Sequence, residues 1–387
     1  MLFGYRILGL TLFVLAALFL LFRPSRLHQI SPLQYLRASG KASPDILNAT
    51  LGFQEVLVLN LPERTDRRDA MTLAAAVTGI DLTWIDGVSG KDVPDKVLPG
   101  DSVDKGISKG NKGSWRAHMN ALQYIIQKNL TTALILEDDA DWDIRLKSQL
   151  QIFAQAAHAF TQPSPQPFSS TFPLDSPSEL SLSQLPTALR PKLTPYGDAF
   201  DVLWLGHCGT SLPQPIPDNI SPSPPPLPLL RVTIPNDPTV PAPKDMKPHP
   251  FALKDEIADL YPPHTRVVHA SKATACTQAY AVSQQGARKL LWRFGLETLT
   301  NGWDFMLKDW CDGLHVGADE KAPVCVTVQP PLFSHHFGKG AASDITAPGG
   351  GFISKEKEMT PYLRWSVRLN LGRLVGGGSV EDQFGEE

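Results

Sequence analysis

The chain alternates short apolar runs with segments of helical spacing, and this alternation constrains the fold more than any other feature. EVLVLNL (55–61) has the character of a buried strand in a parallel or mixed sheet. Pro62 ends it, residues 63–77 then show helical spacing, and LTWIDGVSG (82–90) predicts a second strand with a Gly-rich end. A strand, a helix and a strand in this order predict the opening of an α/β sheet.

The same unit recurs before the most acidic stretch of the chain. Residues 114–129 have helical spacing, and the strand ALILEDD (133–139) follows at once. Open α/β sheets bind ligands at the carboxyl ends of their strands. Side by side in a core, Glu137, Asp138 and Asp139 would repel one another and be poorly solvated, so they predict a positively charged partner. A solvated turn is the alternative.

Further apolar runs extend this domain. DVLWLGHCG (201–209) predicts a core strand, and residues 277–294 predict a strand that feeds a helix. PVCVTVQPP predicts a last strand, which runs into a His- and Gly-rich loop. Two Pro-rich stretches, at about 161–198 and 211–250, are predicted to be extended insertions without sheet or helix, because proline removes backbone donors.

The amino terminus predicts a membrane segment. Residues 7–22 are apolar and lie between Arg6 and Arg23, which favours an uncleaved signal anchor over residues 1–23. A cleaved signal peptide is the alternative, although no small-residue cleavage site follows Phe22. We expect residues 24–52 to form a stem. The main α/β domain would then span 53–346. Residues 347–387 would be a loosely ordered tail with at most one helix over 361–371.

The compartment is indicated by opposing signals. Positive charges after the apolar segment favour a cytosolic body, whereas sequons at Asn48, Asn129 and Asn219 have meaning only in the secretory lumen. The prediction adopted is a single-pass type II membrane protein that faces the lumen of the Golgi or endoplasmic reticulum. Four cysteines allow one or two disulfides without requiring any.

Charge excludes one class of partner. The net charge is only -3, and no basic stripe with interleaved aromatic residues is present. The chain therefore lacks the features of a nucleic-acid-binding protein.

Several motifs in one order resemble glycosyltransferase family 25, which includes lipopolysaccharide-type and collagen galactosyltransferases. They are LNLPERTDRRDAM, IDGVSG, GSWRAHMNALQ, LILEDDADW, AYAVSQQGARKLL, GWDFML and QPPLFSHHFGKGAASDI. The resemblance implies a GT-A-like (Rossmann-like) fold and a nucleotide-sugar donor, often UDP-galactose. It also implies a glycan or glycoprotein acceptor and transfer with inversion. One departure is that Arg116 and Ala117 precede His118, where the family usually has a serine.

The resemblance and the residue types together predict a Mn²⁺ or Mg²⁺ site. Oxygen ligands suit these cations, and carboxylates at i and i+2 of an extended segment point the same way, so Glu137 and Asp139 form a DxD-like pair. Asp138 would point to the opposite side, toward the ribose or a neighbouring strand. The third ligand is expected from His335 or His336, with His336 preferred; the alternative is a pair of surface histidines.

Basic residues are predicted to bind the nucleotide. Arg64, Arg67 and Arg68 follow the first strand, and an arginine can grip a phosphate through two hydrogen bonds. Asp66 would hold one of these arginines or bind the uridine, and Lys339 would neutralise a phosphate. The alternative is an ordinary charged first turn of a helix.

Inverting transfer needs a base for the acceptor hydroxyl, and Asp304 is the candidate. Trp303 beside it could stack on a sugar. Asp309, Asp312 or an N-cap role for Asp304 are the alternatives. His118 would be either a core histidine or a catalytic group near the donor, and Ser343 and Asp344 would close the loop over the site.

Two other functions remain open. One is a membrane-tethered, non-catalytic protein that keeps the fold and binds nucleotide or glycan. The other is a hydrolase or nucleotidyltransferase, but neither a second set of metal ligands nor a Gly-rich phosphate loop is present in the sequence.

Overall fold

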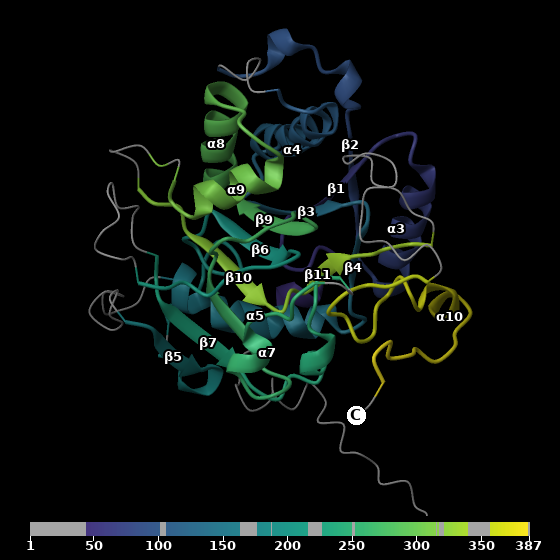
Figure 1. Ribbon diagram of the computed structural model, residues 1–387, viewed down its shortest axis with the longest axis vertical. Coiled ribbons are helices and arrows are strands. Elements are labelled where there is room, and N and C mark those ends of the chain that lie inside the picture. Colours follow the sequence, from purple (N-terminus) through teal and green to yellow (C-terminus); the bar gives the residue numbers. More distant parts are fainter. Residues whose placement is uncertain are drawn as a thin grey trace, which may run out of the picture. The chain divides into compact units, whose positions relative to one another are not determined.

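A computed structural model describes residues 44–100, 106–162, 176–186, 188–215, 227–249, 252–314, 316, 321–339 and 357–385. Its strands form one mixed sheet (Figure 1). These are β1 (Glu55–Asn60), β2 (Thr83–Asp86), β3 (Thr132–Glu137), β4 (Ala140–Trp142), β5 (Ser178–Ser181), β6 (Val202–Gly206), β7 (Leu230–Ile234), β8 (Arg266–Ala270), β9 (Ala279–Ser283), β10 (Cys325–Gln329) and β11 (Phe333–His335).

The order of the strands brings the carboxyl ends of β1, β2, β3, β6 and β10 to one edge. The sheet runs β2-β1-β3-β9-β6-β10-β8-β7-β5, with β11 paired to β4 and β6. Strands β1, β2 and β3 are parallel, and β6 and β10 are parallel. Strand β9 is antiparallel to both β3 and β6, so β6 runs in the same direction as β3. The ends of β1, β2, β3, β6 and β10 therefore share one edge, which we call the site edge.

Helices cover both faces of the sheet. The longer ones are α3 (Thr65–Thr78), α4 (Lys109–Gln127), α5 (Leu146–Thr161), α8 (Gln284–Trp292) and α9 (Trp303–Cys311), with short helices α7 (Ile257–Leu260) and α10 (Leu371–Val375). Serine side chains cap two of them: Ser108 accepts from the Asn111 amide at 3.2 Å, and Ser283 accepts from the Gly286 amide at 3.0 Å.

Strand residues alternate between two hydrophobic cores. Val56, Val58, Leu134 and Leu136 pack with apolar residues of α3 and α5. Their neighbours in the strands, Leu57 and Ile135 among them, pack on the other face with α4, α8 and α9 (Figure 1). This period of two is what a sheet buried on both faces requires.

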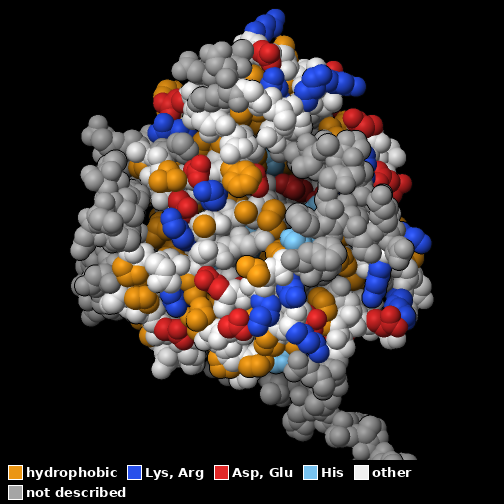
Figure 2. Space-filling view, viewed as in Figure 1, with side chains coloured by type: hydrophobic (Ala, Val, Ile, Leu, Met, Phe, Trp, Pro, Cys, Tyr) orange, Lys and Arg blue, Asp and Glu red, His pale blue; other side chains and the backbone are white. Residues whose placement is uncertain are grey.

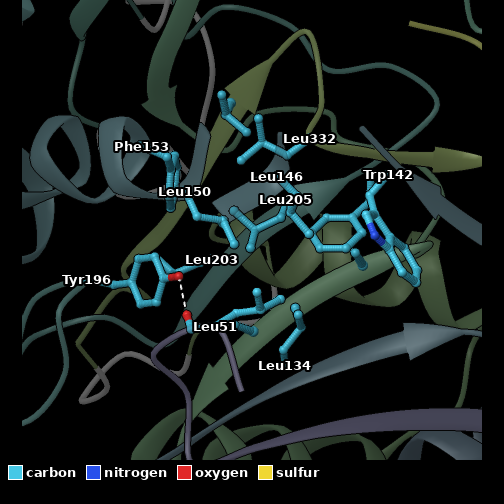
Figure 3. Packing of buried hydrophobic residues seen from close by; sticks show 14 of the residues in the cluster. Leu51, Leu134, Trp142, Leu146, Leu150, Phe153, Tyr196, Leu203, Leu205 and Leu332 are labelled. Atoms are coloured by element: carbon cyan, nitrogen blue, oxygen red, sulfur yellow. Dashed lines mark hydrogen bonds between the residues drawn. The ribbon is translucent and has the colours of Figure 1, made fainter. Parts of the chain in front are cut away.

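Figure 3 shows the first core, where Leu150 and Phe153 lie near Leu203 and Leu205, and Trp142 lies at the other side of the residues drawn. Tyr196 is fully buried there, and its hydroxyl donates to the Leu51 carbonyl at 2.5 Å, so its one polar atom is satisfied. This bond ties the chain before β1 to the segment before β6.

The strands and helices predicted from the apolar runs are confirmed. The runs at 55–61, 82–90, 133–139 and 201–209 form β1, β2, β3 and β6, and residues 277–294 form β9 and α8. The α/β fold class is therefore confirmed as a mixed sheet between helices.

The predicted absence of sheet and helix in the Pro-rich stretches is wrong, because strands and the short 3-10 helices Leu182–Gln184 and Pro243–Asp245 lie within them. Residues 178–181 and 230–234 form β5 and β7, which pair in parallel at the far end of the sheet. Both segments are free of proline, so their donors are available, and Val232 and Ile234 are buried in the first core. Strands can form within a Pro-rich stretch wherever the prolines lie outside the pairing residues.

The carboxyl-terminal segment also differs from the prediction. Residues 361–371 are not a helix, and the short helix α10 begins only at Leu371. Tyr362, Leu363 and Val367 are buried, so the described part of the tail packs against the domain. The boundaries predicted for the domains stay a prediction.

The predicted signal anchor lies outside the described residues, as do Asn219, Ser343 and Asp344. In the part of the chain that the structure describes, no helix has the length and apolar character needed to cross a membrane.

Candidate functional site

An acidic turn lies on the site edge. Strand β3 ends at Glu137, the chain turns at Asp138 and Asp139, and β4 begins at Ala140. We call residues 137–139 the acidic turn. Figure 2 shows acidic and histidine side chains in a hollow on this face, where Figure 1 places β3 and β11. The predicted location of the carboxylates at a strand's carboxyl end is confirmed.

The three carboxylates do not face as the period of two predicts. One Arg67 nitrogen, Nη1, lies 2.6 Å from Asp138 Oδ1 and 2.8 Å from Asp139 Oδ2. Glu137 turns elsewhere, and its Oε1 accepts from the Thr277 hydroxyl at 2.6 Å. Because the strand ends at Glu137, the alternation of an extended chain does not continue into the turn, and the two aspartates share one face.

The surroundings of the two aspartates differ. Asn60 donates to Asp138 Oδ2 at 2.8 Å, yet burial raises the pKa of Asp138, and the charge of Asp139 raises it further. Burial also raises the pKa of Asp139, but the positive charges of His335, Arg67 and Arg368 outweigh that effect and hold its pKa at about 2. The pKa values of the two neighbouring carboxyls are therefore shifted in opposite directions.

His118 is both a buried histidine and a neighbour of the acidic turn. Its Nδ1 hydrogen-bonds the Tyr280 hydroxyl at 2.8 Å, and its Nε2 lies 3.7 Å from Glu137 Oε1. Burial lowers the pKa of His118, which favours the neutral ring. Its ring stacks on Trp303, with centroids 5.0 Å apart.

Trp303 is not placed to stack on a sugar. Its side chain is only 1% exposed and lies against His118 and Phe294 in the second core. The apolar spacing of α9 turns Trp303 inward with Met306 and Leu307. Phe305, two residues on, is the exposed aromatic of this helix turn, at 46%.

Asp304 lies in the first turn of α9, and the helix N-cap is Gly302, so the N-cap alternative for Asp304 is wrong. Its Oδ2 accepts from the Cys276 amide at 3.2 Å. Burial raises the pKa of Asp304, and the charge of Glu137 raises it further. The alternatives are engaged elsewhere: Asp309 pairs with Lys308, and Asp312 accepts from the Ala273 amide.

The three arginines after β1 have three different environments. Arg67 reaches the acidic turn. Arg64 pairs with Asp66 through two bonds of 2.9 and 2.8 Å, and this pairing with Arg64 lowers the pKa of Asp66 to about 2. Arg68 stacks over Trp84 at 4.4 Å. Asp66 therefore holds an arginine, which was one of its two predicted roles.

The side chains of His335 and His336 have different partners, and His335 is the one nearer to the carboxylates. Its Nε2 lies 3.8 Å from Asp139 Oδ2, whereas His336 Nδ1 hydrogen-bonds Thr360 Oγ1 at 3.0 Å. Strand β11 ends at His335 and holds that residue beside β4, whereas His336 follows the strand and donates its backbone amide to the Asp139 carbonyl. Strand β11 in turn packs closely on Gly206, where a Cβ would lie 2.8 Å from that of Phe333. Lys339 is exposed.

The predicted metal ligands Glu137, Asp139 and His336 are not brought together. Across the described residues, no three His, Cys, Asp or Glu side chains lie close enough to hold a metal by themselves. One observation fits a cation that shares its ligands with a bound molecule: Asp139 Oδ1 is buried without a hydrogen-bond partner, and His335 is nearby. The protein's part of such a site would be Asp139 and His335.

One of the two disulfides lies at the site edge, and the other lies at the opposite edge of the sheet. Cys208, just after β6, is bonded to Cys276, whose amide donates to Asp304. Cys311, the last residue of α9, is bonded to Cys325, the first residue of β10. Both cross-links thus fix α9 or its hydrogen-bond partner relative to the sheet.

Sequence reasoning missed the contribution of the carboxyl-terminal segment. Asp141 is fully buried, and its Oδ2 accepts from the hydroxyls of Thr360 and Ser366. The Arg368 side chain lies behind the acidic turn. The only signal in the sequence was the polar, aromatic and basic composition of 360–370, which resembles that of an ordinary tail.

Comparisons with known proteins agree with the motifs. The sequence model described as "Glycosyltransferase family 25 (LPS biosynthesis protein)" matches residues 53–166. Procollagen galactosyltransferase 1-B of Xenopus laevis is 31% identical over 112 residues, which are 26% of this chain and 18% of the relative. Procollagen galactosyltransferase 1 of Danio rerio is 31% identical over 116 residues, 27% of this chain and 19% of the relative.

A third relative carries a different description. The probable inactive glycosyltransferase 25 family member 3 of Bos taurus is 24% identical over 120 residues, 28% of this chain and 20% of the relative. The chain therefore covers about a fifth of the length of the curated relatives that it matches. The resemblance to glycosyltransferase family 25 is confirmed. We call residues 53–166, which this family model matches and which carry Arg67, His118 and the acidic turn, the family 25 segment.

Proposed function

We propose that this protein is a glycosyltransferase that moves galactose from UDP-galactose to a glycan or glycoprotein acceptor with inversion. The observation that carries the proposal is the pairing of Arg67 with the acidic turn at the carboxyl ends of β1 and β3, within the family 25 segment. The matched relatives named as galactosyltransferases support the choice of sugar. A GT-A-like fold is the corresponding proposal for the architecture.

The donor would bind where Arg67 and Asp139 meet. The leaving diphosphate gains negative charge as the glycosidic bond breaks, and Arg67 offers a guanidinium that can hold phosphate oxygens through paired bonds. Arg68, close by on the same turn of α3, adds a second positive charge. When bound to Asp139 and His335, a Mn²⁺ or Mg²⁺ ion would supply further neutralisation of the diphosphate.

Asp304 is the proposed base for the acceptor hydroxyl. Its raised pKa makes it a stronger base than an ordinary carboxylate, and the Cys276 amide fixes one of its oxygens. Neutral His118 stays stacked on Trp303 beside Glu137, which keeps Glu137 in place next to the site. Phe305 offers the exposed aromatic surface that Trp303 does not, so we assign sugar stacking to Phe305.

The proposed location is the lumen of the Golgi or endoplasmic reticulum, behind an amino-terminal anchor. Two disulfides among the four cysteines support an oxidising compartment. Asn48 and Asn129 are both exposed, as glycosylated asparagines must be.

A non-catalytic binding protein is the second candidate, because Arg67 neutralises the same carboxylates that a cation would need. Nucleotide binding alone would fit both functions, so the discriminating experiment must follow turnover. The full-length chain, purified in detergent, would be offered a panel of UDP-, GDP- and CMP-sugars with Mn²⁺. Metal-dependent binding and consumption of one UDP-sugar supports the transferase, whereas binding without consumption for every donor and a broad acceptor mixture supports the second candidate.

A further inference from the structure

A segment near the carboxyl terminus lies directly behind the acidic turn. We call residues 357–370 the carboxyl-terminal strap. Met359 pairs with Phe337 through two backbone bonds of 2.9 and 3.1 Å, just after β11. The Val367 amide donates to the Trp142 carbonyl at 2.9 Å, just after the acidic turn. The strap is therefore joined to β4, which follows the turn, and to the chain just after β11, the strand that pairs with β4.

The backbone carbonyls of Asp138, Asp139 and Ala140 each accept a hydrogen bond from another segment of the chain. Arg368 Nη2 donates to the Asp138 carbonyl at 2.6 Å, and Arg368 Nε donates to the Ala140 carbonyl at 3.2 Å. Between them, the His336 amide donates to the Asp139 carbonyl at 2.8 Å. With its carbonyls held on one side, the turn has little freedom to change where the Asp138 and Asp139 side chains point.

Asp141 fastens the strap to the same place. Its Oδ1 accepts from the Arg368 amide at 3.0 Å and from the Trp142 amide at 2.8 Å. Its Oδ2 accepts from Thr360 Oγ1 at 2.7 Å and from the Ser366 hydroxyl. A buried carboxylate with this many donors is well satisfied, so the strap and the turn share one network of hydrogen bonds.

Arg368 is buried and lies among the aspartates of the turn. Its residue is 8% exposed, and it bonds backbone carbonyls in place of solvent. A buried guanidinium is stable only with such partners and with negative charge nearby. Asp138 and Asp139 thus have Arg67 on their open side and Arg368 on their buried side.

We propose that Arg368 is a positioning residue: it fixes the backbone of the acidic turn so that Asp139 and Arg67 meet the diphosphate of the donor. The proposal rests on the proposed function for its ligand, but its structural half stands without it. The strap lies beyond residue 166 and thus outside the family 25 segment, so this part of the chain completes the site from a distant place in the sequence.

The experiment compares Arg368→Met and Arg368→Lys with two controls in the full-length chain. Leu290→Ala removes a buried side chain from α8 and matches a general loss of stability. Arg373→Met removes a half-exposed arginine that pairs with Glu381 just after the strap. Hydrogen exchange is followed in peptides that cover 137–143 and 333–337, and UDP binding is measured by calorimetry with Mn²⁺, at a temperature where circular dichroism shows all variants folded.

We expect Arg368→Met to speed exchange in both peptides at least fivefold and to weaken UDP binding at least tenfold, while neither control does so. Arg368→Lys should recover part of the binding, since one ammonium can reach one carbonyl but not both. Exchange in Arg368→Met equal to that in Leu290→Ala would overturn the proposal. Faster exchange in a protein whose wild type binds no UDP would confirm the positioning and instead contradict the proposed function.

Discussion

Arg67 Nη1 lies 2.8 Å from Asp139 Oδ2, although 72 residues separate the two in the chain. The contact exists because β1 and β3 are adjacent and parallel, so the turn after β1 and the turn after β3 meet at one edge of the sheet. It joins the basic motif and the acidic motif of the family 25 segment into a single site.

Loss of Arg67 should destabilise the fold as well as the site. Arg67→Met leaves Asp138 buried without its ion-pair partner, and breaking a buried pair costs about 3 kcal/mol. Arg64→Met is the matched control, because its partner Asp66 is largely exposed and such pairs contribute at most about 1 kcal/mol. Urea unfolding of both variants measures the difference. Equal midpoints would show that the Arg67 pair contributes no more than a surface pair.

Replacement of Asp304 should abolish turnover and spare donor binding. Asp304→Asn keeps an acceptor for the Cys276 amide but removes the base, so kcat should fall by about 10²- to 10⁴-fold while the Kd for UDP stays within about twofold. Asp309→Asn, on the same helix, should change kcat little. Steady-state rates with UDP-galactose and an acceptor give the answer, and a full rate in Asp304→Asn would remove Asp304 from the mechanism.

Asp255 should make stability fall as the pH rises. Burial raises its pKa to about 7, and its Oδ1 accepts a hydrogen bond from the side-chain Nε2 of Gln329. Since the folded pKa exceeds the unfolded value of 3.8, the folded state binds the proton more tightly. Its contribution is thus fully present below pH 4 and is lost between pH 4 and 7, by about 4 kcal/mol.

The Asp255→Asn variant isolates this contribution. From pH 5 to pH 8 the free energy of unfolding of the variant should increase relative to that of wild type, because only the wild type loses stability as Asp255 ionises. Urea titrations at each pH measure this difference. Asp259→Asn, an exposed neighbour, provides the baseline. A difference between variant and wild type that does not change with pH contradicts the assignment.

A lumenal chain should carry glycans at its exposed sequons. Asn48 and Asn129 are both exposed, and Asn129 lies at the end of α4 with φ of 55°, outside regular structure. Treatment with an amidase that removes N-glycans should increase gel mobility, and Asn48→Gln with Asn129→Gln should each account for one step. Unchanged mobility of chain expressed in secretory cells would argue against the lumen.

A cation should bind tightly only when the nucleotide is also bound. Asp139 and His335 are too few ligands for tight binding of Mn²⁺, and the remaining oxygens would come from the diphosphate. Calorimetry should therefore show weak Mn²⁺ binding alone and at least tenfold tighter binding in the presence of UDP, with the increase lost in His335→Ala and retained in His336→Ala. Equal effects of the two histidine variants would contradict the arrangement of β11.

Much of the fold is predictable from local pattern, because buried strands and amphipathic helices have strong periodicity. EVLVLNL, ALILEDD and DVLWLGHCG each form the strand that their apolar runs indicate. Strands β5 and β7 escape prediction since they are short, lie at the end of the sheet and are surrounded by proline, so their pairing depends on tertiary contacts.

The site is predictable in its residue types and less so in its directions. The motifs indicate Arg67, His118, Glu137, Asp139 and Asp304, and the structure places them at one edge of the sheet or just beneath it. The direction of each side chain depends on the residue at which β3 and β11 end. Because the sequence does not fix the end of β11 to one residue, it does not show whether His335 or His336 lies near Asp139. The role of Arg368 depends on contacts more than 200 residues apart in the chain, which no local pattern contains.

The proposed transferase activity is tested by measuring UDP release from UDP-galactose by the full-length chain, with Mn²⁺ and with a chelator. The same measurement is made on the Asp139→Asn variant. This variant keeps the size of the side chain and removes its charge, and Asp309→Asn controls for the loss of a carboxylate elsewhere. We expect Mn²⁺-dependent release in wild type and in Asp309→Asn, and a loss of at least 100-fold in Asp139→Asn. UDP release that is equal in wild type and Asp139→Asn would contradict the proposal.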